Sequence, residues 1–282
     1  MKNIAKRKVP AWPKVKYALI SVFCVPWVLI PVWLMIVNSM KGQGEAAQLS
    51  LRLPEDFKLW ENYSEVIVEG NYLSALGSSL LVTVPAIAIC LLFGVMSAWI
   101  YGRRDGRFLR VMYFTTSISI LVPPAIIPTI YLLRLMDLDG QPLGYVLFMA
   151  ATRIGIIVFL ATGFVRGVSA DIEEAAAIDG ASLVRTFFQI VVPLLSGVMF
   201  VGGVLLVILI WNDFFFASLM LRSAEDATLP ITLFRVASSS TEGLKWNLVF
   251  AHVILTSLPL VVVYFFAQRK VLAGLTEGGV KG

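Results

Sequence analysis

Three ionisable side chains lie inside long apolar stretches of the sequence and are the residues best placed to do chemistry. They are Arg153, Asp213 and His252. A charged side chain at the centre of a bilayer costs about 2.5 to 3.5 kcal/mol on insertion scales, so such residues usually face a bundle interior or water. One interpretation is a hydrated path whose polar groups hydrogen-bond a solute. The alternatives are an internal structural pair, for example Arg153 with Asp213, or side chains that snorkel to the outer interface.

Aromatic and amide groups flank two of these positions. Trp211 and Asn212 directly precede Asp213, and Trp246 lies six residues before His252. Aromatic rings offer flat apolar faces and amides offer donors and acceptors, which together suit a polyhydroxylated solute. The candidates for a solute path or gate are therefore Arg153, Trp211, Asn212, Asp213, Trp246 and His252, with Phe214 and Phe215 as further aromatic surfaces.

Other chemistries lack the residues they need. His252 is the single histidine, and Cys24 and Cys90 both fall in apolar runs, so we expect no metal ligands and no disulfide framework. No G-x-x-x-x-G-K-[ST] phosphate loop and no nucleophile with an adjacent base are visible. The sequence predicts no catalytic residue, and any ATP and Mg²⁺ must be handled by another polypeptide.

The composition is that of an integral membrane protein. Of 282 residues, 58% are hydrophobic and 15% are charged, against about a quarter charged in soluble domains. Apolar runs of about 20 residues predict membrane-spanning helices, and their lack of period-two alternation excludes a barrel. We expect an all-α polytopic fold with six transmembrane helices at about 17–40, 75–101, 108–133, 144–168, 194–221 and 248–270.

Basic residues set the predicted orientation. They gather in the N-terminal arm and in the loop after the second span, which predicts that both are cytoplasmic. This segregation to loops also argues against nucleic-acid binding, which needs a folded basic surface. With six spans, both termini are cytoplasmic. The residues concerned are Lys2, Lys6, Arg7, Lys8, Lys14 and Lys16 in the arm, and Arg103, Arg104, Arg107 and Arg110 in the loop.

The predicted organisation follows from the spans. The first apolar run is longer than the 7 to 15 residues of a signal-peptide core and lacks a small-x-small cleavage site, so we expect an uncleaved anchor. Pro123, Pro124 and Pro128 should break or kink the third span. The segments are a cytoplasmic arm at 1–16, a first helix at 17–40, an extracytoplasmic segment at 41–74, a core at 75–271 with a cytoplasmic helical element at 169–193, and a cytoplasmic tail at 272–282.

The acidic stretch "DIEEAAAIDGASLVRTFFQIVVP" at 171–193 is too polar for hydrocarbon. Asp171 and Glu174 have capping spacing, and acids in a first turn suit the helix dipole, so a short helix should begin there. Gly180 allows a sharp turn, and Ser182 can cap a second helix. One interpretation is that this stretch is only a helical connector that lies in the lipid headgroup region. The alternative is a helix, bend and helix that presents a ridge of alanines to a partner.

The order and spacing of this stretch resemble the EAA signature of permease subunits in bacterial ABC importers. The pattern Glu-Ala-Ala, three residues, Gly, nine residues, Ile, one residue, Leu-Pro is reproduced, except that Val192 replaces Leu. The resemblance implies a type I ABC importer permease fold, in which this element is a coupling helix that docks on an ATP-hydrolysing subunit. The implied contacts are Glu173, Glu174, Ala175, Ala176, Ala177, Asp179, Gly180, Ala181 and Phe187.

The C-terminal half resembles the carbohydrate-importing branch of that family, and specifically the short maltose-transporter-type permease. The matching stretches are "WNDFFF" from Trp211, "TLPITLF" from Thr228, "WNLVFAH" from Trp246 and "GLTEGGVKG" from Gly274. In that family the tail reaches the ATPase dimer, although this tail departs at Glu277 and Gly279. The implied tail contacts are Thr276, Glu277, Gly278, Val280 and Lys281.

The leading hypothesis is therefore a permease subunit of a binding-protein-dependent ABC importer in the bacterial inner membrane, which forms half of the pathway for a sugar. The implied partners are two copies of an ATPase subunit, a second homologous permease, an extracytoplasmic solute-binding protein that faces residues 222–247, and the lipid bilayer. The alternative is an ion-coupled secondary transporter, which tends to show inverted repeats and midplane acids. A membrane enzyme is a third class, but it lacks a reactive constellation.

Overall fold

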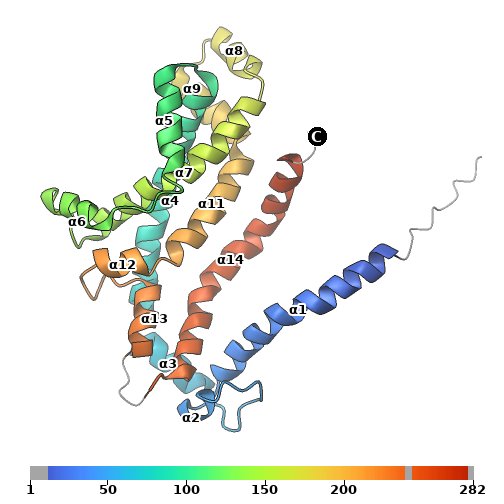
Figure 1. The fold of residues 1–282 in the computed structure, drawn as a ribbon, viewed down its shortest axis with the longest axis vertical. Coiled ribbons are helices and arrows are strands. Elements are labelled where there is room, and N and C mark those ends of the chain that lie inside the picture. The colour runs from blue at the N-terminus through green and yellow to red at the C-terminus, as the bar shows by residue number, and fades with distance from the viewer. Residues whose placement is uncertain (1–11, 239–242, 279–282) are drawn as a thin grey trace, which may run out of the picture. The chain divides into compact units, whose positions relative to one another are not determined.

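The computed structural model describes residues 12–238 and 243–278, and over these residues the chain is helical with no β-strand. It divides into two compact units, Met1–Glu69 with Val236–Ile254, and Gly70–Arg235 with Leu255–Gly282. The elements, labelled in Figure 1, are α1 (Trp12–Asn38), α2 (Gln43–Ala46), α3 (Leu59–Val68), α4 (Tyr72–Arg103), α5 (Arg107–Ile118), α6 (Ile126–Leu135), α7 (Pro142–Gly167), α8 (Asp171–Ile178), α9 (Leu183–Thr186), the π-helix η1 (Phe187–Val191), α10 (Val192–Leu194), α11 (Ser196–Trp211), α12 (Phe215–Met220), α13 (Leu229–Ser238) and α14 (Trp246–Gly278).

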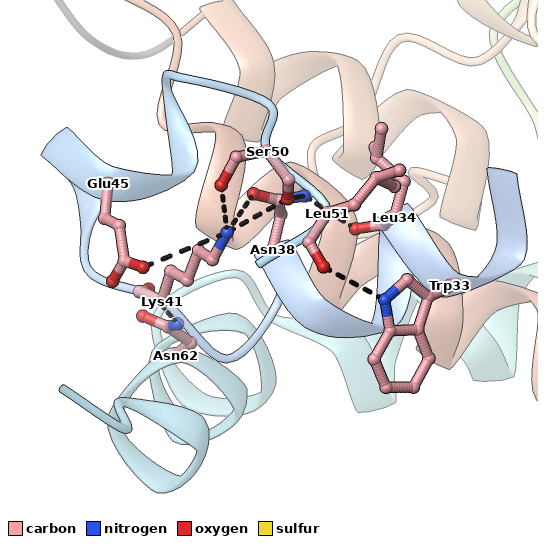
Figure 2. A network of polar contacts seen from close by, with 8 residues as sticks. All are labelled: Trp33, Leu34, Asn38, Lys41, Glu45, Ser50, Leu51 and Asn62. Atoms are coloured by element: carbon pink, nitrogen blue, oxygen red, sulfur yellow. Dashed lines mark hydrogen bonds and ion pairs between the residues drawn. The ribbon is translucent and has the colours of Figure 1, made fainter. Parts of the chain in front are cut away.

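The first unit is held by a buried lysine just after α1 (Figure 2). Lys41 is 0% exposed. Its ammonium donates to Asn38 Oδ1 at 3.2 Å, to the Ser50 carbonyl at 3.0 Å and to Ser50 Oγ at 2.8 Å, and Glu45 lies 3.9 Å away. All three ammonium protons therefore have an acceptor, which is what makes a buried charge tolerable. The contacts close the segment between Lys41 and Ser50 onto the end of α1.

The same network reaches α3 and the first part of α14. Asn62 Nδ2 donates to the carbonyls of Ser39 at 2.9 Å and Lys41 at 2.8 Å. Its Oδ1 accepts from Asn247 Nδ2 at 2.8 Å. One buried amide thus joins three segments that are far apart in the sequence, and the polar residues after α1 fold into a defined cap.

The second unit is built on α4 and α7, whose packing is the most extensive between any two helices of this unit, and α11 packs on both. Small residues permit the close approach of α4 to α7. A Cβ at Gly94 would lie 2.8 Å from Ile157 Cβ, and one at Gly102 would clash with Val165. The core of this unit includes Val95, Ile157 and Leu206, all nearly inaccessible. These helices are the frame on which both candidate sites sit.

The third predicted span, 108–133, is broken, as its prolines predicted. α5 ends at Ile118 and α6 begins at Ile126, with Pro123 and Pro124 between them and Pro128 in the first turn of α6. A proline ring fixes φ and removes a donor, so a helix cannot continue through two successive prolines without loss. The segment thus forms two short apolar helices rather than one continuous span.

The fifth predicted span, 194–221, is also interrupted. The segment Leu183–Leu194 and α11 are bent by 74° at Leu195. Pro193 lies in α10, directly before this bend. At the other end α11 stops at Trp211, and α12 begins at Phe215. The polar residues Asn212 and Asp213 lie in that second break.

Three helices in the described residues are long and apolar enough to cross a membrane, namely α4, α7 and Trp246–Phe266 of α14; a fourth appears if the bent pair counts as one span. The six predicted spans are therefore not all confirmed, and cytoplasmic termini remain a prediction. In α1, the part Val25–Asn38 is an apolar helix that is shorter than a full membrane span.

The two ends of α4 carry different neighbours. Near its start, Ser79 Oγ accepts from Leu229 N at 2.9 Å, and Ser78 Oγ donates to the Glu225 carbonyl at 3.0 Å. Arg103 follows Ser79 by 24 positions. This corresponds to about 36 Å of helix, more than the roughly 30 Å of a hydrocarbon core. The residues around 225–229 and those around Arg103 therefore lie at opposite ends of the second unit.

Candidate functional site

The acidic helix begins where the sequence predicts, but its cap differs. α8 starts at Asp171, with Ala170 as the N-cap residue and no side-chain cap bond. The Asp171 amide instead donates to Ser169 Oγ at 3.3 Å. The predicted capping role of Asp171 is therefore wrong, because the helix starts one residue too early for its carboxylate to serve. Asp171, Glu173 and Glu174 still place negative charge in the first turn, where the dipole favours it.

Gly180 ends α8 in the left-handed conformation, with φ of +78°. The Gly180 amide donates to the Ala177 carbonyl at 3.1 Å, and the Ala181 amide donates to the Ala176 carbonyl at 2.9 Å. This pair of bonds is a Schellman motif, which uses the last carbonyls of the helix. Ser182 then caps α9 by accepting from the Arg185 amide at 3.3 Å. The predicted helix, turn and capped second helix are confirmed.

One surface of α8 is open. Glu174, Ala175 and Ala177 are exposed, as are Asp179 and Gly180. Ala176 is buried and Ala181 is half-buried, so only part of the predicted ridge is free. Large apolar side chains that the sequence analysis had not selected extend this surface: Ile172, Ile178 at 86% exposure, Leu183 and Val184.

The two adjacent glutamates of α8 point to different environments. Glu174 is exposed, and its carboxylate makes no hydrogen bond or ion pair within 12–238 and 243–278. Glu173 is turned toward α4, and its side chain is 15% exposed. Its Oε2 accepts from Trp99 Nε1 at 2.7 Å, and its Oε1 accepts from Arg103 Nε at 2.8 Å. Both carboxylate oxygens of Glu173 are thus used inside the chain.

Arg103 joins three elements. Besides Glu173, its Nη1 donates to the carbonyls of Val165 at 2.7 Å and Val168 at 2.9 Å. Val165 lies in the last turn of α7, and Val168 is its C-cap residue. The carbonyls at the end of a helix lack the amide partners that the helical pattern supplies elsewhere. The arginine, itself 18% exposed, therefore links the end of α4, the end of α7 and the first turn of α8.

Phe187 lies behind this cluster rather than on the open surface. It is 4% exposed, and its ring centroid lies 5.7 Å from that of Trp99 and 4.9 Å from that of Phe188. The same residues line a pocket of about 460 Å³. Phe187, predicted as a partner contact, belongs to the buried core of the second unit, where its ring contacts Trp99 of α4.

A second polar cluster forms at the break between α11 and α12. Asp213 Oδ2 accepts from Tyr145 Oη at 2.8 Å and from the Ala217 amide at 2.9 Å. Asp213 thereby caps the first turn of α12 and ties it to α7. Asn212 beside it is exposed, with its amide donating to the Ile208 carbonyl at 2.8 Å. Tyr145 was not selected from the sequence, since a tyrosine near a helix start carries no distinguishing signal.

Arg153 has no partner among the described residues. It lies on the stripe of α7 that includes the buried Met149, Ala150 and Ile157. Its Nε is inaccessible and unbonded, and its guanidinium makes no hydrogen bond or ion pair with this part of the chain. The internal pair with Asp213 considered from the sequence is therefore not formed.

This pattern of long apolar helices with an exposed, acidic, alanine-rich helix matches a known family. The profile of the binding-protein-dependent transport system inner membrane component family matches residues 56–276. The chain belongs to this family. It is a multi-pass inner membrane permease component, and the family predicted from the 171–193 motif is confirmed.

Several curated permeases are similar along most of their length. The probable starch degradation products transport system permease protein AmyC of Thermoanaerobacterium thermosulfurigenes is 30% identical over 89% of this permease and 91% of its own length. The melibiose/raffinose/stachyose import permease protein MelC of Bacillus subtilis is 27% identical over 90% and 91%. A crystal structure of a bacterial ABC transporter for the import of alginate contains a chain with a TM-score of 0.78 and 21% identity, covering 95% of this permease and 99% of that chain.

The remaining predicted path residues of the permease differ in exposure. Trp211 is 4% exposed, and its Nε1 donates to the Thr256 carbonyl at 3.2 Å, so its ring is not free to stack on a solute in this conformation. Trp246 and His252 belong to the first unit. Trp246 is half-buried and stacks on Phe250 at 5.7 Å between centroids, and His252 is fully buried.

The predicted tail contacts are only partly described. Thr276, Glu277 and Gly278 form the last residues of α14, which continues past the predicted start of the tail at 272. Val280 and Lys281 lie outside the described residues. The described part of the permease also holds no cluster of three His, Cys, Asp or Glu that could bind a metal ion.

Proposed function

We propose that this permease forms half of the transmembrane pathway for a sugar in an ABC importer, and that ATP hydrolysis on a partner subunit drives alternating access. The observation that carries the proposal is the open surface of α8, which combines free carboxylates, small residues and exposed isoleucines. The ATP and Mg²⁺ belong to the partner, since this sequence has no phosphate loop.

The chemistry of α8 suits insertion into a protein cleft. Ala175 and Ala177 let a partner approach the helix backbone, and Ile178 offers apolar area that is unfavourable in water. Glu174 has a carboxylate with no partner in the described part of the chain, and this group is available to a basic group on the partner. The ATPase-facing contacts we propose are thus Glu174, Ala175, Ala177, Asp179 and Gly180.

The orientation follows from the two ends of α4. Arg103, Arg104, Arg107 and Arg110 cluster near the end that carries α8, and the positive-inside rule assigns such a cluster to the cytoplasm. The segment around 225–229 lies at the opposite end. This arrangement favours an extracytoplasmic position for 222–247, where a solute-binding protein would dock.

The solute path is proposed to pass the break between α11 and α12. Asn212 is exposed there, and Asp213 is held by Tyr145 so that its carboxylate keeps a fixed direction. Arg153 offers an unused guanidinium in the middle of α7. A polar group inside a membrane bundle that has no partner among the described residues suits contact with a solute or with a second permease.

The proposed solute is a carbohydrate. The relatives named above are, by their names, permeases for starch degradation products and for melibiose, raffinose and stachyose, and the similar structure belongs to an alginate importer. A further similar structure, with a TM-score of 0.66, is an alginate transporter in complex with its periplasmic protein. We propose a heterodimer with a second permease, two ATPase subunits and a solute-binding protein as the working assembly, with the tail after α14 adding a contact to the ATPase.

Purification of the tagged permease from native membranes in mild detergent tests the proposal. An ATPase subunit and a second permease are expected to co-purify. In proteoliposomes with the solute-binding protein, uptake of radiolabelled maltotriose or alginate trisaccharide should require ATP on the side that carries α8. A proton or sodium gradient alone should drive nothing.

Two results would contradict the proposal. One is a preparation that transports sugar with no ATP-hydrolysing subunit present. The other is uptake that collapses with an ion gradient and is indifferent to ATP, which would favour the secondary transporter. Vanadate, which arrests ABC ATPases, serves as the control that separates hydrolysis from passive leak.

A further inference from the structure

The cluster of Glu173, Trp99 and Arg103 is the best-connected polar group in the second unit. Four bonds of 2.7 to 2.9 Å converge on it. The side chains of Glu173 and Arg103 are only 15% and 18% exposed, so solvent screens this ion pair less than one on the surface. Charge-assisted bonds of this length are stronger and more directional than neutral ones.

We propose that Glu173 is a positioning residue that locks α8 to the ends of α4 and α7, so that a push on α8 moves these two helices as one body. The inference rests on the proposed function and deepens it. It assigns adjacent glutamates to separate tasks, Glu174 to the ATPase and Glu173 to the permease's own frame.

Geometry favours this division over a docking role for Glu173. Both of its carboxylate oxygens already accept a donor from α4, so binding a basic group of another protein would mean breaking one of these bonds. Arg103 is a planar fork with several donors, which lets one side chain hold Glu173 and two α7 carbonyls at once. A lysine has no such fork.

The chain that follows the C-terminal end of α8 is bent. The chain leaves α8 through Gly180 at φ of +78°, passes through the π-helix Phe187–Val191, and turns by 74° before α11. π-helical turns are rare and occur often at functional sites. Between Gly180 and α11, the ring of Phe187 contacts that of Trp99 on α4. Apolar ring contacts tolerate sliding, whereas the bonds of Arg103 do not.

The contacts of Glu173 with Trp99 and Arg103 therefore link α8 more firmly to α4 and α7 than the chain after Gly180 links it to α11. Displacement of α8 reaches α4 and α7 through the bonds of Glu173 and Arg103. The chain from α8 to α11 instead runs through the bend and the π-helix. The consequence is that loss of Glu173 should uncouple ATP hydrolysis from transport without releasing the ATPase.

The test compares Glu173→Gln with Asp171→Asn in the complete assembly. Asp171 lies in the same first turn and is exposed, so the control removes one charge without touching the lock. For Glu173→Gln we expect unchanged ATPase stoichiometry, retained hydrolysis, and a fall of about tenfold in sugar moved per ATP. The probe is radiolabelled maltotriose or alginate trisaccharide, whichever the unaltered assembly accumulates. Hydrogen exchange of amides 171–179 should also speed up, whereas Asp171→Asn should match the unaltered protein.

A second substitution, Arg103→Lys, keeps the charge but removes the fork. It should show the same uncoupling, to a smaller degree. The proposal is overturned if Glu173→Gln or Arg103→Lys keeps the full transport-to-hydrolysis ratio, or if Glu173→Gln loses the ATPase subunit, which would make Glu173 a docking contact. If the unaltered assembly shows no ATP-dependent uptake at all, the proposed function itself fails, and that result is distinct from failure of the lock.

Discussion

The turn at Gly180 offers the sharpest test of the coupling surface. A Cβ placed on Gly180 meets no atom within 4 Å, and the same holds for Gly77 in α4. The two positions differ in backbone conformation, since Gly180 has φ of +78° and Gly77 is helical. Substitution of each by valine therefore separates backbone strain from steric bulk.

The expected magnitude follows from that difference. Holding a non-glycine residue in the left-handed region costs about 1 to 3 kcal/mol, with β-branched residues at the upper end. The strain is relieved if the last turn of α8 unwinds and loses the bonds of the Gly180 and Ala181 amides. A cost of about 2 kcal/mol lowers the ratio of native to unwound turn roughly thirtyfold. Gly77→Val pays no such cost, because valine is at least as good as glycine in a helix.

Uptake per assembled complex is the assay, with membrane insertion checked by the yield of folded permease. Gly180→Val should transport at less than about a tenth of the unaltered rate, and Gly77→Val at the full rate. Gly180→Asn should be intermediate, since asparagine tolerates the left-handed region better than valine. Full transport by Gly180→Val, or an asparagine variant no better than valine, would refute the role assigned to this turn.

Three further substitutions test the rest of the structure. Lys41→Met leaves the acceptors of the buried network unpaired, so it should lower the free energy of unfolding by about 2 kcal/mol or more, measured by thermal melting. Lys58→Met removes only the half-exposed ion pairs with Asp56 and Glu61, and should change it by less than about 1 kcal/mol. Tyr145→Phe removes a hydroxyl donor from Asp213 and should lower the same free energy by about 1 to 2 kcal/mol; an unchanged melting temperature would show that the bond is not needed. Arg153→Gln should reduce uptake while ATPase binding and melting stay unchanged, and a loss of folded protein instead would favour a purely structural role.

Local signals explain what the sequence could predict. The start of α8, the turn at Gly180 and the cap at Ser182 each depend on residues within a few positions, and all three are found. The break of the third span follows from adjacent prolines. The family motif at 171–193 predicted that this stretch is the coupling element, because the spacing of the motif covers the whole stretch.

Long-range contacts explain what the sequence could not predict. Nothing local distinguishes Glu173 from Glu174, since both lie in the first turn of one helix. A rotation of about 100° between successive residues separates them. The deciding partner, Arg103, lies 70 positions earlier in the chain. The burial of Phe187 is a similar case, because its ring contacts that of Trp99, which lies far earlier in the sequence.

Lys41 and Arg153 show how hydrogen-bond partners distinguish a structural cation from a functional candidate. Lys41 has an acceptor for each of its three protons on its own chain, so its charge is fully accounted for by the fold. Arg153 has none in the described residues, and its Nε is both buried and unbonded. A buried donor left unpaired costs about 1 to 3 kcal/mol, and more when it is charged. The Arg153 residue as a whole is half-buried, so the cost falls on its Nε, which has no partner among the described residues. A solute or a second permease would supply that partner, and uptake rather than stability is the measurement that tests this role.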